Sequence, residues 1–164
     1  MFEHLETPEQ LFIFKLGSAM TMEKDSLHML EDLESEAQRA DLKTLFREHA
    51  GETRQQIANL EQCFSLLGQP VHESPSPTTK GLAKEGKATL RKTDAGLADV
   101  VVLSGALETE HYETAVYEGL ITSADALGQP AVAQLLRQNL DQEMAAIVKI
   151  QEAAKLVAGQ PKGD

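Results

Sequence analysis

The chain has 164 residues, and its 26 aspartates and glutamates against 15 lysines and arginines give a formal net charge of −11. This length predicts a single domain over residues 1–164 that can bury a core without disulfides. The negative charge argues against binding to nucleic acid or to an anionic membrane, because both partners require a basic face.

The first predicted helix runs from about residue 8 to residue 37. Thr7 stands where an N-cap is expected, Pro8 occupies the first turn, and Gln10 follows the cap by three residues. Apolar residues then recur with the spacing of a core-facing helix, namely Phe12, Leu16, Ala19, Met20, Leu27, Leu30 and Leu33. One charged residue, Glu23, interrupts this apolar stripe.

The second predicted helix runs from about residue 40 to Gly68. Gly68 is followed by Gln69 and Pro70, so a glycine C-cap and a proline end the helix there. The core-facing stripe of this helix is polar for two turns in its middle, where it carries His49, Glu52, Thr53 and Gln56.

A long crossover separates the two halves of the chain. Residues 70–79 are rich in proline and serine and predict an extended connector. Residues 81–90 predict a short helix, and residues 92–94 predict a break after it. Crossovers of this kind join the two hairpins of ferritin-like four-helix bundles.

Two more long helices are predicted, from about residue 94 to 128 and from 130 to about 157. The tripeptide Gly-Gln-Pro ends each of them, at 128–130 and at 159–161, and a frayed tail is predicted over 159–164. No strand pattern is present in the sequence. The elements therefore predict an all-α, ferritin-like four-helix bundle of two helical hairpins, joined by a crossover with a short extra helix.

A glutamate interrupts the apolar stripe of each long helix, and these four residues are Glu23, Glu52, Glu113 and Glu143. A buried carboxylate costs roughly several kcal/mol unless a cation or a proton neutralises it. Four carboxylates that converge on one interior predict a cation site. Oxygen ligands inside a helix bundle favour paired iron or manganese ions as the cofactor.

Two more residues join the predicted ligands. Glu110 stands three residues before Glu113 and shares its helix face, and His49 stands three residues before Glu52. The alternatives are that His49 is a core histidine with its own hydrogen-bond partner, and that the glutamates of the first and last helices pair with a buried arginine or a partner chain. The predicted metal ligands are Glu23, Glu52, Glu110, Glu113, Glu143 and His49.

Four further residues are predicted to support these ligands through hydrogen bonds, and they are His111, Gln56, Thr53 and Tyr117. His111 lies between two of the predicted ligands, and the sequence does not decide whether His111 or His49 binds a metal directly. An ordinary helical role stays open for Gln56 and Thr53, and plain core packing stays open for Tyr117.

Other features concern location and assembly. Residues 1–6 lack the basic and apolar parts of a signal peptide, and no stretch approaches the ~20 apolar residues of a membrane span, so we expect a cytoplasmic protein. The single cysteine, Cys63, excludes an internal disulfide and a thiolate metal site. Apolar residues on outer helix faces, Phe2, Phe14 and Leu97, favour a homodimer.

These motifs resemble the bacterial YciE/YciF family of ferritin-like stress proteins over nearly the whole chain. The most specific motif is Glu110-His111-Tyr112-Glu113, followed by Tyr117. The other matching motifs are Glu23, His49-x-x-Glu52-Thr53-x-x-Gln56, Gly81-Leu82-x-x-Glu85, Asp99, Ala124-x-x-Leu127-Gly128 and Leu140-x-x-Glu143. The resemblance implies a dimeric ferritin-like bundle, a di-metal site between its helices and a role in stress responses.

The chain departs from the di-iron enzymes of this fold at two places. Those enzymes carry Glu-x-x-His on two helices, whereas Gln55 and Ala146 stand three residues after Glu52 and Glu143. Ile147 stands where members of the resembled family often carry an acidic residue. Both departures predict fewer metal ligands than a catalytic di-iron centre has.

The main functional hypothesis is a protein of stress or redox protection in which Glu52 or Glu113 bridges two iron or manganese ions. Its reaction would be metal-dependent oxidation of Fe(II) or peroxide, and the sequence leaves open whether it is an enzyme. The alternative is a non-enzymatic helical interaction or scaffold protein with a degenerate or vacant metal site. A phosphotransfer role for His49 or His111 is disfavoured, because neither histidine is expected to be exposed beside basic residues.

Overall fold

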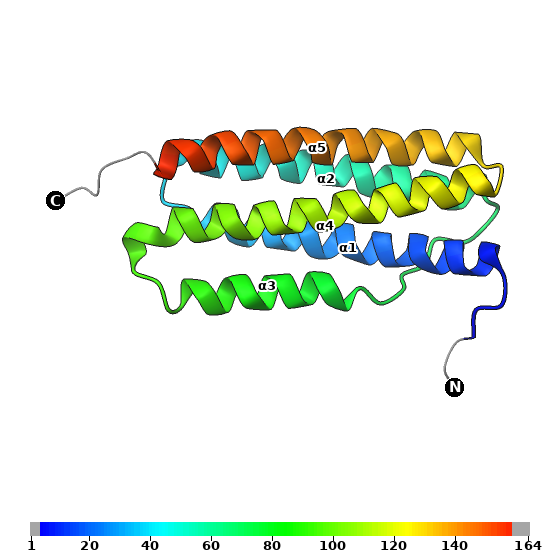
Figure 1. Cartoon of the computed structure of the whole chain (residues 1–164), viewed down its shortest axis with the longest axis horizontal. Helices are drawn as coiled ribbons and strands as arrows, with labels where there is room; N and C mark the ends of the chain where they lie inside the picture. Colours follow the sequence, from blue (N-terminus) through cyan, green and yellow to red (C-terminus); the bar gives the residue numbers. More distant parts are fainter. Residues whose placement is uncertain (1–3, 159–164) are drawn as a thin grey trace.

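The computed structural model describes residues 4–158, which form a bundle of four long helices and one shorter helix (Figure 1). The elements in chain order are α1 (Pro8–Glu36), α2 (Ala40–Leu66), α3 (Pro77–Leu90), the 3-10 turn η1 (Ala95–Leu97), α4 (Ala98–Ala126) and α5 (Pro130–Ala158). The described residues contain no strand. The predicted all-α, ferritin-like bundle of two hairpins and a crossover is confirmed.

Local capping chemistry sets the start of α1 and the ends of α2 and α4, as predicted. At the start of α1 the backbone N–H of Gln10 donates to the hydroxyl of Thr7 at 3.2 Å, and the Gln10 side chain accepts from the Thr7 backbone. After α2 and α4, Gly68 and Gly128 have φ angles of 65° and 67°, a left-handed conformation that glycine adopts without strain. The third Gly-Gln-Pro and the tail at 159–164 lie outside the described residues.

The crossover differs from its prediction at two points. Helix α3 starts at Pro77 instead of residue 81, because the fixed φ of proline suits the first turn of a helix. Helix α4 starts at Ala98 instead of near residue 94, because η1 makes one tighter turn before it. The connector is therefore shorter, and α3 longer, than the sequence predicted.

The connector before α3 is fastened along α1. Thr79 is buried, and its hydroxyl donates to the carboxylate of Asp25 at 3.0 Å. Gly17 allows this close approach, since a Cβ atom there would lie only 2.7 Å from the hydroxyl oxygen of Ser74. As a result, α3 covers the side of the bundle that α1 and α4 form (Figure 1).

Two apolar clusters fill the two ends of the bundle. The first contains Phe12, Leu16, Met20, Leu60, Cys63, Phe64, Leu120, Val132 and Leu136. The second contains Leu30, Leu42, Phe46, Val102, Leu103 and Ile150. Cys63 is buried, as expected of a packed thiol. Between the two clusters, all four long helices turn polar side chains inward, and this polar layer contains the candidate site.

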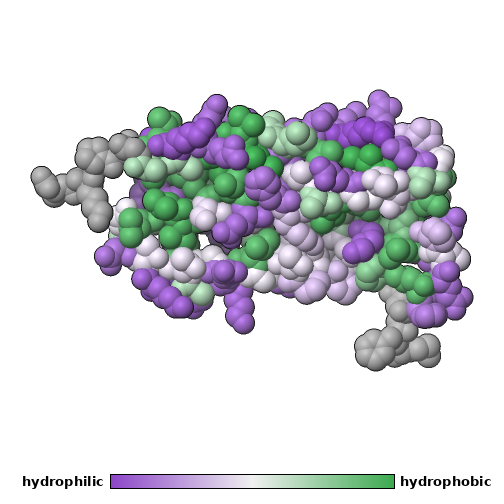
Figure 2. Space-filling model, viewed as in Figure 1, coloured by the Kyte–Doolittle hydropathy of each residue, from purple (hydrophilic) through white to green (hydrophobic). Residues whose placement is uncertain are grey.

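The surface mixes hydrophilic and hydrophobic side chains (Figure 2). Among residues 4–158, no helix is both long and apolar enough to cross a membrane. Of the apolar residues predicted on outer faces, Leu97 is 45% exposed, Phe14 is half-buried and Phe2 lies outside the described residues. The homodimer therefore stays a prediction.

Candidate metal centre

Four glutamates and one histidine lie buried in the polar layer between the apolar clusters. Glu23 of α1, Glu110 and Glu113 of α4, and Glu143 of α5 are each at most 1% exposed, and His49 of α2 is 4% exposed. Each of these residues continues the core-facing stripe of its own helix. Five of the six predicted ligands are thus brought together by all four long helices.

These five residues form two overlapping groups. One, the His49 group, contains His49, Glu110 and Glu143, and the other, the Glu23 group, contains Glu23, Glu113 and Glu143. Within each group, one potential ligand atom from every residue lies within 4.8 Å of the others. Glu143 belongs to both groups, so its two carboxylate oxygens can serve two neighbouring cations. Glu143 is thus the residue common to both groups, whereas the sequence predicted Glu52 or Glu113 as the bridge.

Many of the carboxylate oxygens have no hydrogen-bond partner among the described residues. They are Oε2 of Glu23, Oε2 of Glu110, Oε1 of Glu113 and both oxygens of Glu143. A buried polar atom without a partner loses its hydration and gains nothing in return, which is costly for a carboxylate. Oxygen atoms left free in this way, together with one imidazole, match the ligands that iron and manganese take in helix bundles.

His49 currently makes a hydrogen bond through each ring nitrogen. Its Nε2 atom lies 3.0 Å from Oε1 of Glu110 and 3.7 Å from Oε2 of Glu143, and its Nδ1 atom lies 3.0 Å from Oε2 of Glu52. Burial alone lowers the pKa of His49, but the bonds to Glu110 and Glu52 outweigh it and raise the pKa to about 10. His49 is therefore an imidazolium that places a positive charge inside the His49 group.

Glu52 lies outside both groups, although the sequence predicted it as a ligand. Its side chain is 30% exposed, and its Oε1 atom accepts a hydrogen bond from Nζ of Lys149 at 3.0 Å. The bond from His49 contributes most to lowering the pKa of Glu52 to about 2, although partial burial opposes this. An ionised Glu52 on Nδ1 orients the imidazole, as carboxylates commonly do for histidine ligands of metals.

The carboxyl groups of the Glu23 group bind protons more tightly than ordinary glutamates do. Burial raises the pKa of Glu23 to about 8, even though the hydroxyl of Tyr117 donates to its Oε1 atom. Burial raises the pKa values of Glu113 and Glu143 well above the ordinary 4.5, and the negative charge of neighbouring carboxylates raises them further. Without a cation, this group is neutralised by protons.

The four predicted supporting residues lie in different places. Tyr117 is fully buried and contacts Glu23 through its hydroxyl. The hydroxyl of Thr53 donates to the backbone carbonyl of His49 at 3.1 Å, and the buried amide of Gln56 has no partner among the described residues. His111 does not reach the layer, because it is turned about 100° from Glu110 around the helix and is exposed.

Two buried asparagines that the sequence interpretation missed also belong to this layer. Asn139 of α5 is fully buried and Asn59 of α2 is 6% exposed, and their side chains are hydrogen-bonded to each other at 2.7 Å. Asn139 lies one turn before Glu143 on the same core-facing stripe. A polar residue at that spacing was the signal that could have identified it.

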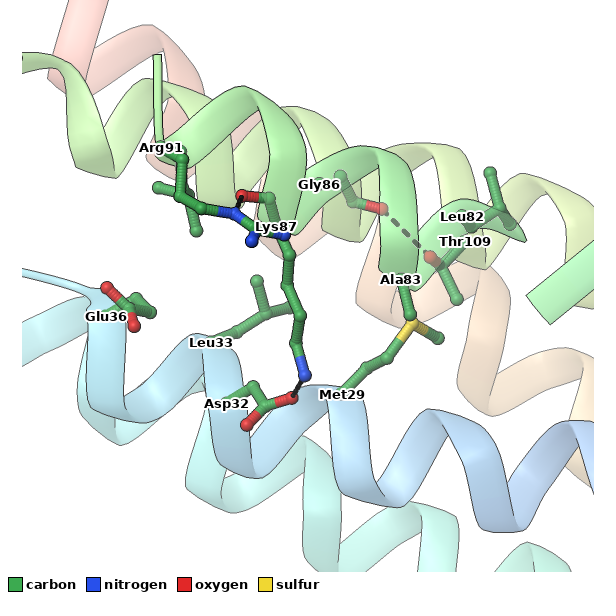
Figure 3. A pocket seen from close by; sticks show the side chains of 12 residues that line it. Met29, Asp32, Leu33, Glu36, Leu82, Ala83, Gly86, Lys87, Arg91 and Thr109 are labelled. Atoms are coloured by element: carbon green, nitrogen blue, oxygen red, sulfur yellow. Dashed lines mark hydrogen bonds and ion pairs between the residues drawn. The ribbon is translucent and has the colours of Figure 1, made fainter. Parts of the chain in front are cut away.

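A separate groove lies where α3 packs alongside α1 and α4 (Figure 3). It has a volume of about 520 Å³, and Met29, Leu33, Leu82 and Leu90 are among the residues that line it. Figure 3 shows Lys87 of α3 reaching toward Asp32 of α1, and the two form an ion pair at 2.6 Å. None of the buried glutamates lines this groove, so it is distinct from the candidate metal centre.

Comparisons with known proteins agree with the fold and with the resemblance found in the sequence. Residues 7–160 match the family model described as "Domain of unknown function (DUF892)". The chain is 28% identical over 153 residues to Protein YciF of Escherichia coli (strain K12), an alignment that covers 92% of each chain. The predicted resemblance to the YciE/YciF family is confirmed by these matches.

Solved structures of similar proteins have the same fold. The crystal structure of the E. coli stress protein YciF matches with a TM-score of 0.90 and 26% identity, and it covers 96% of this chain and 100% of that one. YcfI of Rhodopseudomonas palustris matches with a TM-score of 0.89 and 31% identity, over 92% of this chain and 97% of that one. A protein of Xanthomonas campestris pv. campestris matches with a TM-score of 0.73 and 25% identity, over 93% of this chain and 94% of that one.

Proposed function

The chain belongs to the DUF892 family, and we propose that it binds a pair of iron or manganese ions inside its ferritin-like bundle and acts in stress or redox protection in the cytoplasm. The observation that carries this proposal is the set of five buried carboxylate oxygens that find no hydrogen-bond partner within residues 4–158, all in one layer of the bundle. The stress-related role is supported by the similar E. coli protein, which is described as a stress protein.

Five residues would hold the two ions. The His49 group would hold one and the Glu23 group the other, with Glu143 shared between them. Such a pair of ions, when bound, supplies redox chemistry toward Fe(II) or peroxide. The apolar clusters above and below the layer keep bulk water away from the ligands, which strengthens the attraction between carboxylate and cation.

Binding requires the residues to release their protons. His49 must give up its Nε2 proton and its bond to Glu110 before Nε2 can serve as a ligand. The bond from Nδ1 to Glu52 stays in place during this change and keeps the ring oriented. The protons held by the Glu23 group must leave as well, so metal binding is coupled to proton release.

A second candidate function is a non-enzymatic helical interaction protein with a degenerate metal site. It is favoured by the internal neutralisation of the cluster: the imidazolium of His49 faces Glu110, and protons neutralise the Glu23 group. A cluster that is already neutral does not need a metal ion for stability. In that case the buried residues would contribute only to the packing and specificity of the fold.

Metal titration distinguishes the two functions. Metal-free protein is titrated anaerobically with Fe(II) and separately with Mn(II), and the bound metal is measured after desalting. We expect the wild type to bind a pair of ions, and Glu143→Gln to lose both because both groups share Glu143. The matched control is Glu118→Gln on the exposed face of α4, which should bind like the wild type. Absence of binding by the wild type would favour the interaction protein.

We further propose a homodimer. Three exposed apolar residues, Leu97, Val100 and Leu156, lie where the start of α4 is close to the end of the antiparallel α5, and they are 45%, 47% and 62% exposed. Exposed apolar side chains that form a contiguous patch are typical of protein interfaces. Light scattering of the purified protein tests the proposal, and a monomer at all concentrations would contradict it.

A further inference from the structure

A chain of side-chain hydrogen bonds runs from the surface of α2 to Glu23. Nε2 of Gln55 donates to Oδ1 of Asn59 at 3.1 Å, and Nδ2 of Asn59 donates to Oδ1 of Asn139 at 2.7 Å. Nδ2 of Asn139 donates to the hydroxyl oxygen of Tyr117 at 2.9 Å, and that hydroxyl donates to Oε1 of Glu23. Every bond in the chain therefore points in the same direction, from the exposed Gln55 to the buried carboxylate.

The orientation of the Asn139 amide follows from its partners. Its oxygen accepts from Asn59, and its nitrogen donates to Tyr117 and, at 3.2 Å, to the backbone carbonyl of Gln56. If the amide were turned over, its nitrogen would face the nitrogen of Asn59, so two donors would meet. Its oxygen would then face the carbonyl oxygen of Gln56, so two acceptors would meet. Since Asn139 is fully buried, water cannot repair these contacts, and the nitrogen stays toward Tyr117.

This orientation determines what Tyr117 can do. Its oxygen already receives a hydrogen bond from Asn139, so its own proton is directed to Oε1 of Glu23. With Oε1 held in this way, Oε2 of Glu23 has no partner among the described residues and belongs to a carboxylate grouped with Glu113 and Glu143. Tyr117 thus favours an ionised Glu23 with one oxygen free.

The chain positions Glu23 and does not conduct protons. A proton relay needs groups that accept a proton and release another, whereas side-chain amides such as those of Asn59 and Asn139 remain neutral and unchanged near neutral pH. The chain fixes the direction of each hydrogen bond, so a change at Asn59 or Asn139 should alter the hydrogen bonding of the Tyr117 hydroxyl.

We propose that Asn139 is a positioning residue of the metal centre, acting through Tyr117 to hold Glu23 ready to bind the cation of the Glu23 group. This inference rests on the proposed metal-binding function. It predicts a selective effect, because the His49 group contains neither Tyr117 nor Glu23. Loss of Asn139 should weaken the cation site of the Glu23 group and leave the site of the His49 group unchanged.

A first experiment needs no metal. The chain has two tyrosines and no tryptophan, so Tyr112→Phe leaves Tyr117 as the only tyrosine. The tyrosine doublet in the ultraviolet resonance Raman spectrum reports whether the phenol donates or accepts hydrogen bonds. In this background we expect Asn139→Ala to shift the doublet toward a phenol that only donates. An unchanged doublet would show that Asn139 does not act on Tyr117.

A second experiment measures Mn(II) binding by calorimetry. We expect Asn139→Ala to weaken one of two binding steps by about tenfold, the size typical of a supporting hydrogen bond, and to leave the other step unchanged. Adding Asn139→Ala to Tyr117→Phe should cause no further loss, because Asn139 acts through Tyr117. Asn59→Ala removes a side chain that is hydrogen-bonded to Asn139 and not directly to Tyr117 or Glu23. It should weaken the same step, and it provides a second variant in case Asn139→Ala misfolds.

The matched control is Thr109→Val on α4, which removes the hydroxyl of a buried threonine that donates to the backbone carbonyl of Gly105. It should leave both binding steps unchanged. Equal weakening of both steps by Asn139→Ala, or no weakening, would overturn the role of Asn139 while the metal centre itself stands. Absence of Mn(II) and Fe(II) binding by the wild type would overturn both proposals.

Discussion

On one side of the buried layer, the negative charge of the His49 group meets a positive charge that belongs to the protein. His49 bonds Glu110 and Glu52, and Glu52 continues to Lys149 near the surface. On the other side, Glu23 receives a hydrogen bond from the neutral hydroxyl of Tyr117, which is bonded in turn to Asn139, and the raised pKa values of the Glu23 group favour its protonated carboxyl groups.

The His49 group and the Glu23 group therefore oppose metal binding for different reasons. In the His49 group a cation must replace the positive charge of an imidazolium that already has two hydrogen bonds. In the Glu23 group a cation must replace protons on carboxyl groups with raised pKa values. The same comparison predicts opposite effects on stability when one residue is removed from each half.

The largest effect is expected for His49→Gln. This change removes the internal cation and leaves the buried Glu110 facing Glu143 without a positive partner, and breaking a buried pair in this way costs about 3–5 kcal/mol. Urea unfolding of the metal-free protein near pH 7 measures the loss. His111→Gln on the exposed face of α4 is the control and should change stability by less than about 0.5 kcal/mol. Equal effects of the two variants would contradict the account.

The pKa shifts in both groups determine how the stability of the metal-free protein depends on pH. The pKa of Glu23 is about 8 in the folded state and 4.5 in the unfolded chain, so its contribution to stability is lost as the pH rises from 4.5 to 8. The pKa of His49 is about 10 in the folded state and 6.5 in the unfolded chain, so its contribution is lost as the pH rises from 6.5 to 10. Glu52, lowered from 4.5 to about 2, makes stability fall as the pH drops through that window.

The metal-free protein should therefore be most stable near pH 4.5, and should lose on the order of a few kcal/mol by pH 8. Urea unfolding across this range, without metal and with Mn(II), measures the dependence. Because the bound metal takes the place of the protons, Mn(II) should stabilise the protein most at pH 8. A metal-free stability that rises from pH 5 to pH 8 would be inconsistent with this assignment.

A smaller effect, of opposite sign, is expected for Glu113→Leu. The side chain is buried beside other carboxyl groups, and replacing buried ionisable groups by apolar ones often stabilises a protein. We expect a gain of about 1–2 kcal/mol in the metal-free unfolding free energy, together with loss of the metal in the Glu23 group. Glu118→Leu on the exposed face is the matched control. A destabilised Glu113→Leu that still binds metal normally would argue against the predicted role.

The smallest effect is expected for Lys149→Met. Lys149 pairs with Glu52 at 3.0 Å, but its side chain is 43% exposed, and exposed ion pairs contribute less than about 1 kcal/mol. His49 keeps its bond to Glu52 in this variant, so the interior pair is preserved. Urea unfolding measures the change. A loss of stability as large as that of His49→Gln would mean that the ion pair of Lys149 with Glu52, and not the pair of His49 with Glu110, contributes most to stabilising the buried layer.

The parts of the fold that depend on local chemistry could be predicted from the sequence. The start of α1 follows from Thr7 and Gln10, and the ends of α2 and α4 follow from Gly68 and Gly128. The docking of the connector and α3 against α1 could not be predicted, because the fit of the buried Thr79 against Asp25 depends on contacts between distant segments.

The candidate site shows the same limit. Glu23, Glu110, Glu113 and Glu143 could be identified because each breaks an apolar stripe, which requires only the helical period. Whether a residue at the edge of a stripe faces inward depends on how each helix is rotated against its neighbours. That rotation places Glu52 outside the two groups and leaves His111 exposed. Asn139 was missed because its role depends on Tyr117, a partner on a different helix.

The central claim is that the buried layer binds a pair of metal ions, and anomalous X-ray scattering from crystals grown with Mn(II) tests it most directly. The account predicts two anomalous peaks inside the bundle, one beside His49 and Glu110 and one beside Glu23 and Glu113, with Glu143 next to both. An interior without anomalous density, in which His49 still bonds Glu110 while Mn(II) binds only at the surface, would contradict it.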